Sequence, residues 1–295
     1  MHRILIGYRL LLLSLVLSTG SLLTVLFQRG TMPPQGIQSL ITRWWHRSIT
    51  KSLGIPVRVY GTPRKAATLF VSNHVSSFDI AALGSVLPVH FLSKAEVQHW
   101  PILGWLATRA GTLYIHRGGR EAAVNANNAM AEALLKNHNV MLFPEGTTTD
   151  GNVRRFHSRL MQSAVDSGVY IQPVAIRYPD PGGSKAHPDV HYVDGMSFMD
   201  LSKRILTAKN LEVEIYFLDA ISAKDKSRDE LARYAENEVR NKLESLYKKQ
   251  EPGTGTWNPE PRTQNLNSGA CDPCQKKAQG CGNDDGRACR QVLVE

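Results

Sequence analysis

The first 78 residues of this 295-residue chain contain no aspartate and no glutamate. Nine lysines and arginines lie in the same stretch, so this quarter of the chain accounts for the whole formal net charge of +9. Acidic and basic residues balance in the remainder. Such an asymmetry indicates an anionic partner for one end of the molecule, either a membrane surface or a nucleic acid.

Cysteine is absent from residues 1–270, and all four cysteines follow in the last 25 residues: Cys271, Cys274, Cys281 and Cys289. Residues 251–295 are rich in Gly, Pro, Asn, Asp and Gln and have too few apolar side chains to bury a core, so they predict a disordered tail. The first two cysteines form a CxxC pair, but the later gaps match no zinc pattern. Two interpretations remain: a metal-binding knuckle, or a tail whose cysteines are reduced and dispensable. The second is preferred in a cytosolic setting.

Charge is also absent from Leu10–Phe27, a run of eighteen residues. At 1.5 Å per residue, such a helix nearly crosses a hydrocarbon core of about 30 Å. We therefore predict a membrane anchor over residues 1–30, which favours a membrane over nucleic acid as the partner. A cleaved signal peptide and a buried helix are the alternatives. More basic residues follow the run than precede it, which places the main domain on the cytoplasmic face.

A second membrane element is predicted over residues 31–55. Apolar residues recur there at helical spacing, and the pair Trp44 and Trp45 is interleaved with Arg43, Arg47 and Lys51. Paired tryptophans among basic residues are typical of an amphipathic helix in the headgroup region. The alternative is a helix packed on the domain with a solvated basic face.

Residues 56–250 predict an α/β domain. Short β-rich runs begin near residues 57, 68, 89, 111, 140, 170 and 211, and helical patterns separate most of them. This alternation indicates a mixed, mostly parallel sheet flanked by helices, preceded by the membrane helix and the interfacial helix. A polar-faced helix over residues 228–249 closes the domain.

His74 and Asp79 stand five positions apart, and their spacing excludes one continuous helix if they are to meet. On a helix, five residues turn through about 500°, which leaves the two side chains on different faces. They meet if His74 ends a strand and a helix begins near Phe78, with Ser76 and Ser77 as capping residues. The Asp79 carboxylate would then fix the imidazole tautomer and leave the second ring nitrogen as a base. No GxSxG motif is present, so the hydroxyl to be deprotonated belongs to the substrate.

Polar residues follow three further predicted strands. Lys94, Arg117 and Glu145 each come at a strand end, and Glu145 opens a Glu-Gly-Thr turn with backbone amides suited to an anion. Ligands of α/β sheets gather beyond the carboxyl ends of the strands, so these residues and His74 are expected at one edge.

The chain resembles the PlsC-like glycerolipid acyltransferases, which include the lysophosphatidic acid acyltransferases. Four blocks carry the resemblance: "NHVSSFD" (73–79), "KAEVQHWPILGWLATRAGTLYIHR" (94–117), "FPEGT" (143–147) and "IQPVAI" (171–176). The resemblance implies that His74 is the base and Asp79 its partner. It further implies a substrate-binding set: Asn73, Lys94, Arg117, Glu145, Gly146 and Thr147.

By the same resemblance, the expected reaction moves a fatty acyl group from acyl-CoA or acyl-carrier protein to lysophosphatidic acid, with no metal and no further cofactor. One departure matters. The family usually has arginine and serine after FPEGT, whereas this chain has Thr148 and Thr149. Arg154, Arg155 or Arg159 could replace the arginine. An acyltransferase for lyso-ornithine lipid or another lysophospholipid therefore remains the alternative, and a non-catalytic lipid-binding protein is the alternative of another class.

Overall fold

A mixed eight-stranded sheet forms the centre of the structure, a computed structural model that describes residues 2–27, 36–116, 119–191 and 196–248. The strands are β1 (Val57–Tyr60), β2 (Thr68–Ser72), β3 (His90–Lys94), β4 (Leu113–Ile115), β5 (Val140–Leu142), β6 (Tyr170–Arg177), β7 (Val213–Phe217) and β8 (Ile221–Ser222). Their order is β1-β7-β6-β2-β5-β3-β4, and β8 pairs with β6. Only the pairings of β6 with β7 and β8 are antiparallel among those described. The predicted mixed, mostly parallel α/β fold is confirmed.

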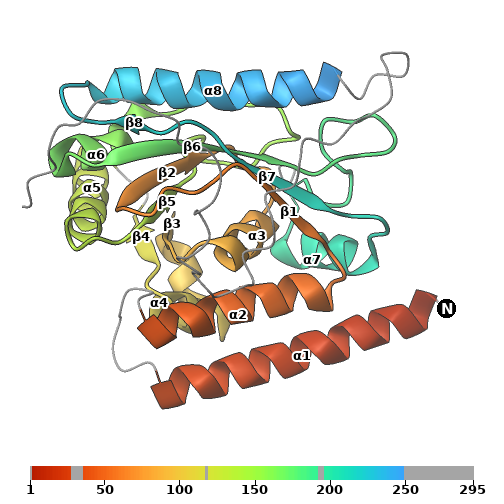
Figure 1. Cartoon of the computed structure of the whole chain (residues 1–295). Coiled ribbons are helices and arrows are strands. Elements are labelled where there is room, and N and C mark those ends of the chain that lie inside the picture. Colours follow the sequence, from red (N-terminus) through yellow and green to blue (C-terminus); the bar gives the residue numbers. More distant parts are fainter. Residues whose placement is uncertain (1, 28–35, 117–118, 192–195, 249–295) are drawn as a thin grey trace, which may run out of the picture. The chain divides into compact units, whose positions relative to one another are not determined.

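Helices cover both faces of the sheet (Figure 1). They are α1 (His2–Phe27), α2 (Gly36–Ser52), α3 (Phe78–Val86), α4 (Leu103–Arg109), α5 (Gly119–Leu135), α6 (Gln162–Ser167), α7 (Phe198–Thr207) and α8 (Arg228–Lys248), with 3-10 turns η1 (Ala95–His99) and η2 (Ser158–Met161). Alternating strand residues supply two separate cores. Phe70 and Met141 pack with residues of α3 and α7, whereas Leu69 and Val140 pack with residues of α5, α6 and α8. This period of two explains why the strand sequences are apolar on both faces.

The structure adds elements that the sequence pattern did not predict. α7 lies between β6 and β7, where no helix was expected, and the two-residue β8 and the turn η1 were also missed. α4 begins only at Leu103, because an irregular turn precedes it.

The two N-terminal helices pack on the α3 and α7 side of the sheet. Arg9 of α1 donates hydrogen bonds to the carbonyl oxygens of Leu206 (2.7 Å) and Ala208 (3.1 Å) at the end of α7. Gly20 of α1 meets the ring of Trp45 on α2 so closely that a methyl group there would clash. Within the described residues, α1 is the one helix long and apolar enough to cross a membrane.

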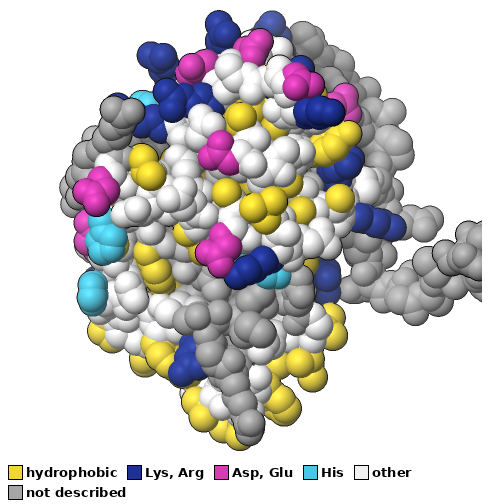
Figure 2. Space-filling view, turned by 90° about the vertical axis from the view of Figure 1, so that its left-hand side faces the viewer, with side chains coloured by type: hydrophobic (Ala, Val, Ile, Leu, Met, Phe, Trp, Pro, Cys, Tyr) yellow, Lys and Arg dark blue, Asp and Glu magenta, His cyan; other side chains and the backbone are white. Residues whose placement is uncertain are grey.

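α2 packs one face on the domain and exposes apolar side chains on the other. His46 is buried against Gly84 of α3, and burial lowers the pKa of its imidazole to about 4, so it is neutral at physiological pH. The opposite face leaves Ile37, Leu40 and Trp44 exposed. Hydrophobic side chains accordingly gather at the lower end of the view in Figure 2, at the height of α1 and α2 in Figure 1, while charged side chains dominate the upper part.

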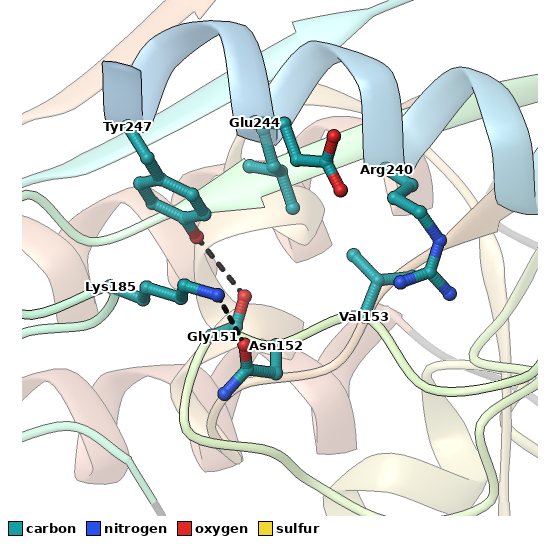
Figure 3. A pocket seen from close by; sticks show the side chains of 8 residues that line it. Gly151, Asn152, Val153, Lys185, Arg240, Glu244 and Tyr247 are labelled. Carbon is teal, nitrogen blue, oxygen red and sulfur yellow. Dashed lines mark hydrogen bonds between the residues drawn. The ribbon is translucent and has the colours of Figure 1, made fainter. Parts of the chain in front are cut away.

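α8 holds the long loop that follows β5. Its Glu236 accepts a hydrogen bond from the backbone N–H of Phe156 (2.9 Å), and the hydroxyl of Tyr247 donates to the carbonyl of Gly151 (3.1 Å). Tyr247 lines a small pocket in which Lys185 bonds the side chain of Asn152 (Figure 3). These contacts fix the middle and the end of the loop on the helix that closes the domain.

Candidate active site

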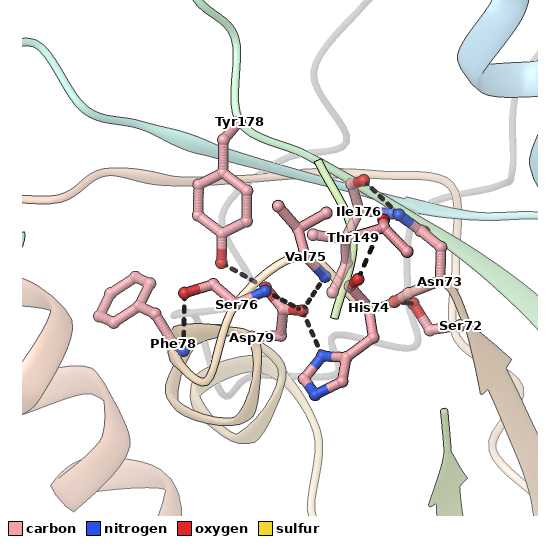
Figure 4. A network of polar contacts seen from close by, with 10 residues as sticks. All are labelled: Ser72, Asn73, His74, Val75, Ser76, Phe78, Asp79, Thr149, Ile176 and Tyr178. Atoms are coloured by element: carbon pink, nitrogen blue, oxygen red, sulfur yellow. Dashed lines mark hydrogen bonds and ion pairs between the residues drawn. The ribbon is translucent and has the colours of Figure 1, made fainter. Parts of the chain in front are cut away.

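His74 and Asp79 meet in the loop between β2 and α3. The Nδ1 atom of His74 lies 2.8 Å from Oδ2 of Asp79 (Figure 4). β2 ends at Ser72 and α3 begins at Phe78, so the chain reverses between the two residues as the spacing predicted. The imidazole is 18% exposed while the carboxylate is fully buried, so the ring alone is open to a substrate.

Asp79 accepts four hydrogen bonds. Its Oδ2 also receives the backbone N–H groups of Val75 (2.8 Å) and Ser76 (3.1 Å), and its Oδ1 receives the hydroxyl of Tyr178 (2.6 Å). Because each of these groups is a donor, Asp79 acts as an acceptor-only carboxylate, and Nδ1 of His74 must carry the proton. The other ring nitrogen points away from the network in Figure 4 and keeps its lone pair.

Tyr178 is the residue of this network that sequence reasoning missed. It follows β6, ninety-nine positions after Asp79, and is completely buried. Burial and the Asp79 charge raise the pKa of its hydroxyl well above the ordinary value, so it remains a donor.

The capping prediction was half wrong. Ser76 Oγ accepts the backbone N–H of Phe78 (3.3 Å), but Ser77, the N-cap residue of α3, makes no side-chain capping bond. Asp79 lies in the first turn of α3, and its carboxylate accepts the backbone N–H groups of Val75 and Ser76 in the loop that precedes the helix. The loop is therefore organised around the carboxylate rather than around the two serines.

The loop after β5 packs against the His74 ring and its backbone. Phe143 stacks on the imidazole, with ring centroids 4.1 Å apart and an interplanar angle of 17°. Thr149 donates its backbone N–H (2.8 Å) and its hydroxyl (3.2 Å) to the carbonyl oxygen of His74. The two loops thus hold the histidine from its ring, its carbonyl and its Nδ1 atom.

Glu145 lies beside this assembly with a carboxyl group in a different state. It is 4% exposed, and its Oε2 atom is buried without a hydrogen-bond partner among the described residues. Burial raises the pKa of Glu145 to about 8, although hydrogen bonds from the backbones of Arg154 and His74 act in the opposite direction. The group is therefore mostly protonated at neutral pH.

Gly146 and Thr147 continue the turn. Gly146 has φ +70°, a conformation that favours glycine, and a Cβ added there would meet nothing within 4 Å. Open space therefore lies above the turn, next to Glu145. Thr147 is half-buried on the same turn.

The other residues of the predicted substrate-binding set do not all lie beside His74 and Glu145. Asn73 is buried, and its amide bonds both the carbonyl (3.0 Å) and the N–H (2.8 Å) of Ile176 on β6, so it locks the end of β2 to the neighbouring strand. Lys94 is exposed at the carboxyl end of β3, on the same sheet edge as His74. Arg117 and the four tail cysteines lie outside the described residues. In the part of the chain that is described, no group of three His, Cys, Asp or Glu is placed to hold a metal.

A family profile described as Acyltransferase matches residues 56–177. A lyso-ornithine lipid O-acyltransferase from Pseudomonas aeruginosa is 43% identical over 206 residues, which cover 69% of this chain and 78% of the relative. A second lyso-ornithine lipid O-acyltransferase, from Brucella abortus, is 32% identical and aligns over 71% of this chain and 84% of its own length.

A relative named for a phosphate-bearing acceptor is similar in sequence over a shorter range. A 1-acyl-sn-glycerol-3-phosphate acyltransferase from Neisseria gonorrhoeae is 36% identical over 163 residues, covering 54% of this chain and 63% of the relative. Among solved structures, the crystal structure of the 1-acyl-sn-glycerophosphate acyltransferase PlsC from Thermotoga maritima matches with a TM-score of 0.61. At 20% sequence identity over 83% of this chain and 98% of that one, this match supports the fold alone.

Proposed function

This chain belongs to the glycerolipid and lysolipid acyltransferase family, and on that premise we propose that His74 is the general base of an O-acyltransferase that acts on lyso-ornithine lipid. The single observation that carries the chemistry is the buried Asp79 carboxylate, whose four hydrogen bonds leave only one tautomer of His74.

In the proposed reaction, the free nitrogen of His74 takes the proton from the hydroxyl of the lysolipid. The alkoxide oxygen attacks the thioester carbonyl, the carbon–sulfur bond breaks, and the imidazolium returns the proton to the departing thiolate. The products are an ester and a free thiol, and no covalent enzyme intermediate forms. General-base assistance of this kind contributes ~10²–10⁴-fold. The buried Asp79 stabilises the imidazolium that forms during the reaction.

The acceptor is proposed from the polar groups around the open turn. An ornithine head group acylated on its α-amino group carries one ammonium and one carboxylate. Glu145 offers a buried oxygen without a partner in the described structure, which an ammonium would bind and ionise. Arg154 lies near enough to act on the Glu145 pKa and is exposed, so it is placed to bind a carboxylate. The higher identity to relatives named for lyso-ornithine lipid supports the same acceptor.

Lysophosphatidic acid is the second candidate acceptor. The relatives named for 1-acyl-sn-glycerol-3-phosphate favour it, and a protonated Glu145 could donate a hydrogen bond to a phosphate oxygen. Thr148 weighs against it, because a threonine cannot grip a phosphate with two parallel hydrogen bonds as the usual arginine can.

We further propose that the donor is acyl-CoA or acyl-carrier protein, and that the catalytic domain works at the cytoplasmic face of a membrane held by α1. The exposed apolar surface of α1 supports the membrane setting. A non-catalytic lipid-binding role would not require an ordered His74–Asp79 pair with an open ring nitrogen.

An acceptor panel tests the proposal. The purified full chain is supplied with one thioester donor and, in separate reactions, lyso-ornithine lipid, lysophosphatidic acid and another lysophospholipid. We expect the highest kcat/KM with lyso-ornithine lipid. A preference for lysophosphatidic acid would select the second candidate, and transfer to none of them would reject the proposed reaction.

A variant that adds a positive charge beside the turn tests how the site distinguishes the two acceptors. Thr148→Arg should raise kcat/KM for lysophosphatidic acid relative to lyso-ornithine lipid several-fold, because it supplies a guanidinium beside the turn. Thr62→Arg is the matched control. Thr62 is exposed and follows β1, which runs opposite to β2, so it lies at the far end of the sheet. Equal shifts in both variants would show that the added charge acts only at long range.

A further inference from the structure

Ile102 is the centre of a strained turn. Its backbone angles are φ 61° and ψ −57°, and the N–H of Leu103 donates to the carbonyl of Pro101 at 2.6 Å. This is a γ-turn of the rare positive-φ kind, and a β-branched residue adopts it only at a cost in conformational energy. The Ile102 side chain is nevertheless 60% exposed. Strain that surrounding structure maintains in an exposed apolar residue suggests a functional role.

The turn does not stand alone. Trp100 contacts Phe198 at the start of α7, with ring centroids 4.8 Å apart, and this contact joins segments almost one hundred residues apart in sequence. The next residue of α7, Met199, is also 60% exposed. We refer to Trp100, Ile102 and Met199 as the apolar rim. Single exposed apolar residues are ordinary on a protein surface, but a cluster from two packed segments marks a contact site.

The apolar rim adjoins the helix that is suited to a bilayer. α1 contacts both α4, which begins directly after Ile102, and α7, which carries Met199. Arg9 of α1 ties the other end of α7 through the carbonyls of Leu206 and Ala208. The rim is therefore held at a fixed place relative to the exposed apolar side chains of α1.

Exposed basic residues follow Met199 along α7. Lys203, Arg204 and Lys209 are exposed on α7 and just beyond it, and only Asp200 opposes them within α7, where it forms a surface ion pair with Lys203. Lysine and arginine beside exposed apolar side chains suit a bilayer that contains anionic lipids, since the charges bind headgroups while the apolar groups enter the acyl region.

We propose that the apolar rim is a second membrane-contact element, which inserts Ile102, Met199 and the edge of Trp100 into an anionic lipid leaflet beside α1. This inference does not depend on which acceptor is used. Because the turn begins at Pro101, seven residues after Lys94 at the end of β3, its insertion would hold the active-site edge of the sheet close to the bilayer surface.

A depth measurement on the full chain tests the proposal. The four tail cysteines are replaced by serine, and an environment-sensitive fluorophore is attached through Ile102→Cys. Asn237→Cys, on an exposed position of α8, is the matched control. Both proteins are bound to vesicles of phosphatidylethanolamine and phosphatidylglycerol. The label is then challenged with lipids brominated in the acyl chain and with iodide in the water.

We expect the label at position 102 to be quenched by brominated acyl chains and shielded from iodide, with the reverse pattern at position 237. Equal iodide quenching at both positions would overturn the proposal. Shielding at position 102 by added acyl-carrier protein but not by vesicles would also overturn it and would assign the rim to a protein partner. Neither readout uses acyl transfer, so failure here is distinct from failure of the proposed reaction.

An activity measurement supplies a second test. Ile102→Ser combined with Met199→Ser should raise the apparent KM for an acceptor embedded in vesicles several-fold and leave kcat unchanged. With an acceptor dissolved in detergent micelles, the variant should match the unmodified protein. An equal loss in vesicles and micelles would contradict a role in membrane contact.

Discussion

The loop of residues 73–79 and the loop of residues 143–157 each bury one carboxyl group within the same site, and the two groups have different surroundings. Asp79 accepts four hydrogen bonds, from His74, Val75, Ser76 and Tyr178. Glu145 has one oxygen without a partner among the described residues, and burial raises its pKa to about 8.

Asp79 is thus fully hydrogen-bonded within the described structure, whereas Glu145 is not. A carboxylate that accepts four hydrogen bonds holds its imidazole in one orientation. A buried carboxyl group with an unused oxygen remains protonated until a cation or another donor reaches it. The first loop can therefore be complete before substrate binds, whereas under the proposed function the acceptor completes the second.

The largest effect is expected when the saturated carboxylate is removed. Asp79→Asn places an amide N–H against donors and no longer stabilises an imidazolium, so we predict a fall in kcat of ~10²–10⁴-fold. Steady-state acyl transfer measures it, and thermal unfolding shows whether the variant is folded at the assay temperature. A folded variant with near-normal kcat would remove Asp79 from the mechanism.

A smaller effect is expected from the buried hydroxyl behind Asp79. Tyr178→Phe removes one hydrogen bond to a charged group, which is worth roughly 1.5–3 kcal/mol, and we predict a fall in kcat of about tenfold. Tyr234→Phe, which loses only a bond to the carbonyl of Asp219 at the surface, is the control. Equal kcat values for the two variants would show that three hydrogen bonds suffice to hold Asp79.

The stacked ring of Phe143 connects the two loops and should have a few-fold effect. Phe143→Leu keeps an apolar side chain but removes the π face that stabilises the imidazolium, so kcat should fall. Phe143→Tyr should retain the kcat of the unmodified protein. An unchanged kcat in the leucine variant would show that Phe143 contributes only packing.

Glu145→Gln should change the pH dependence of stability. Between its ordinary pKa of 4.5 and the folded value of about 8, the unfolded chain ionises Glu145 while the folded protein does not. The folded state then binds more protons, so the free energy of unfolding falls as pH rises through this window. In Glu145→Gln, the part of the decrease in the free energy of unfolding that comes from Glu145 should be absent. Denaturant unfolding across the window measures it, with exposed Glu121→Gln as the control; parallel curves for wild type and Glu145→Gln would contradict the raised pKa.

Local pattern predicted much of the fold and the meeting of His74 with Asp79. The short apolar runs identified seven of the strands, and the runs are clearest in β2, β5, β6 and β7, which are buried on both faces. The five-residue gap required a turn, which places His74 and Asp79 together whatever surrounds them. α7 was missed although its capping box, Ser197 with Asp200, is readable in the sequence as S-x-x-D.

Features that depend on contacts between distant parts of the chain could not be predicted from local sequence patterns. Tyr178 reaches Asp79 only because β6 lies beside β2 in the sheet, and no local spacing encodes that pairing. The protonated state of Glu145 follows from burial by the assembled loops. The family resemblance places Asn73 in the substrate-binding set, and no local spacing shows that its amide bonds the backbone of Ile176 on β6.

The most direct test of the central claim is the rate of acyl transfer by the full chain with His74→Ala, measured beside the unmodified protein in the same vesicles with the preferred acceptor. The account predicts a loss of ~10²–10⁴-fold in kcat with thermal unfolding unchanged, because the protein then has no base beside the acceptor hydroxyl. Transfer by the folded variant within a few-fold of the unmodified rate would contradict it.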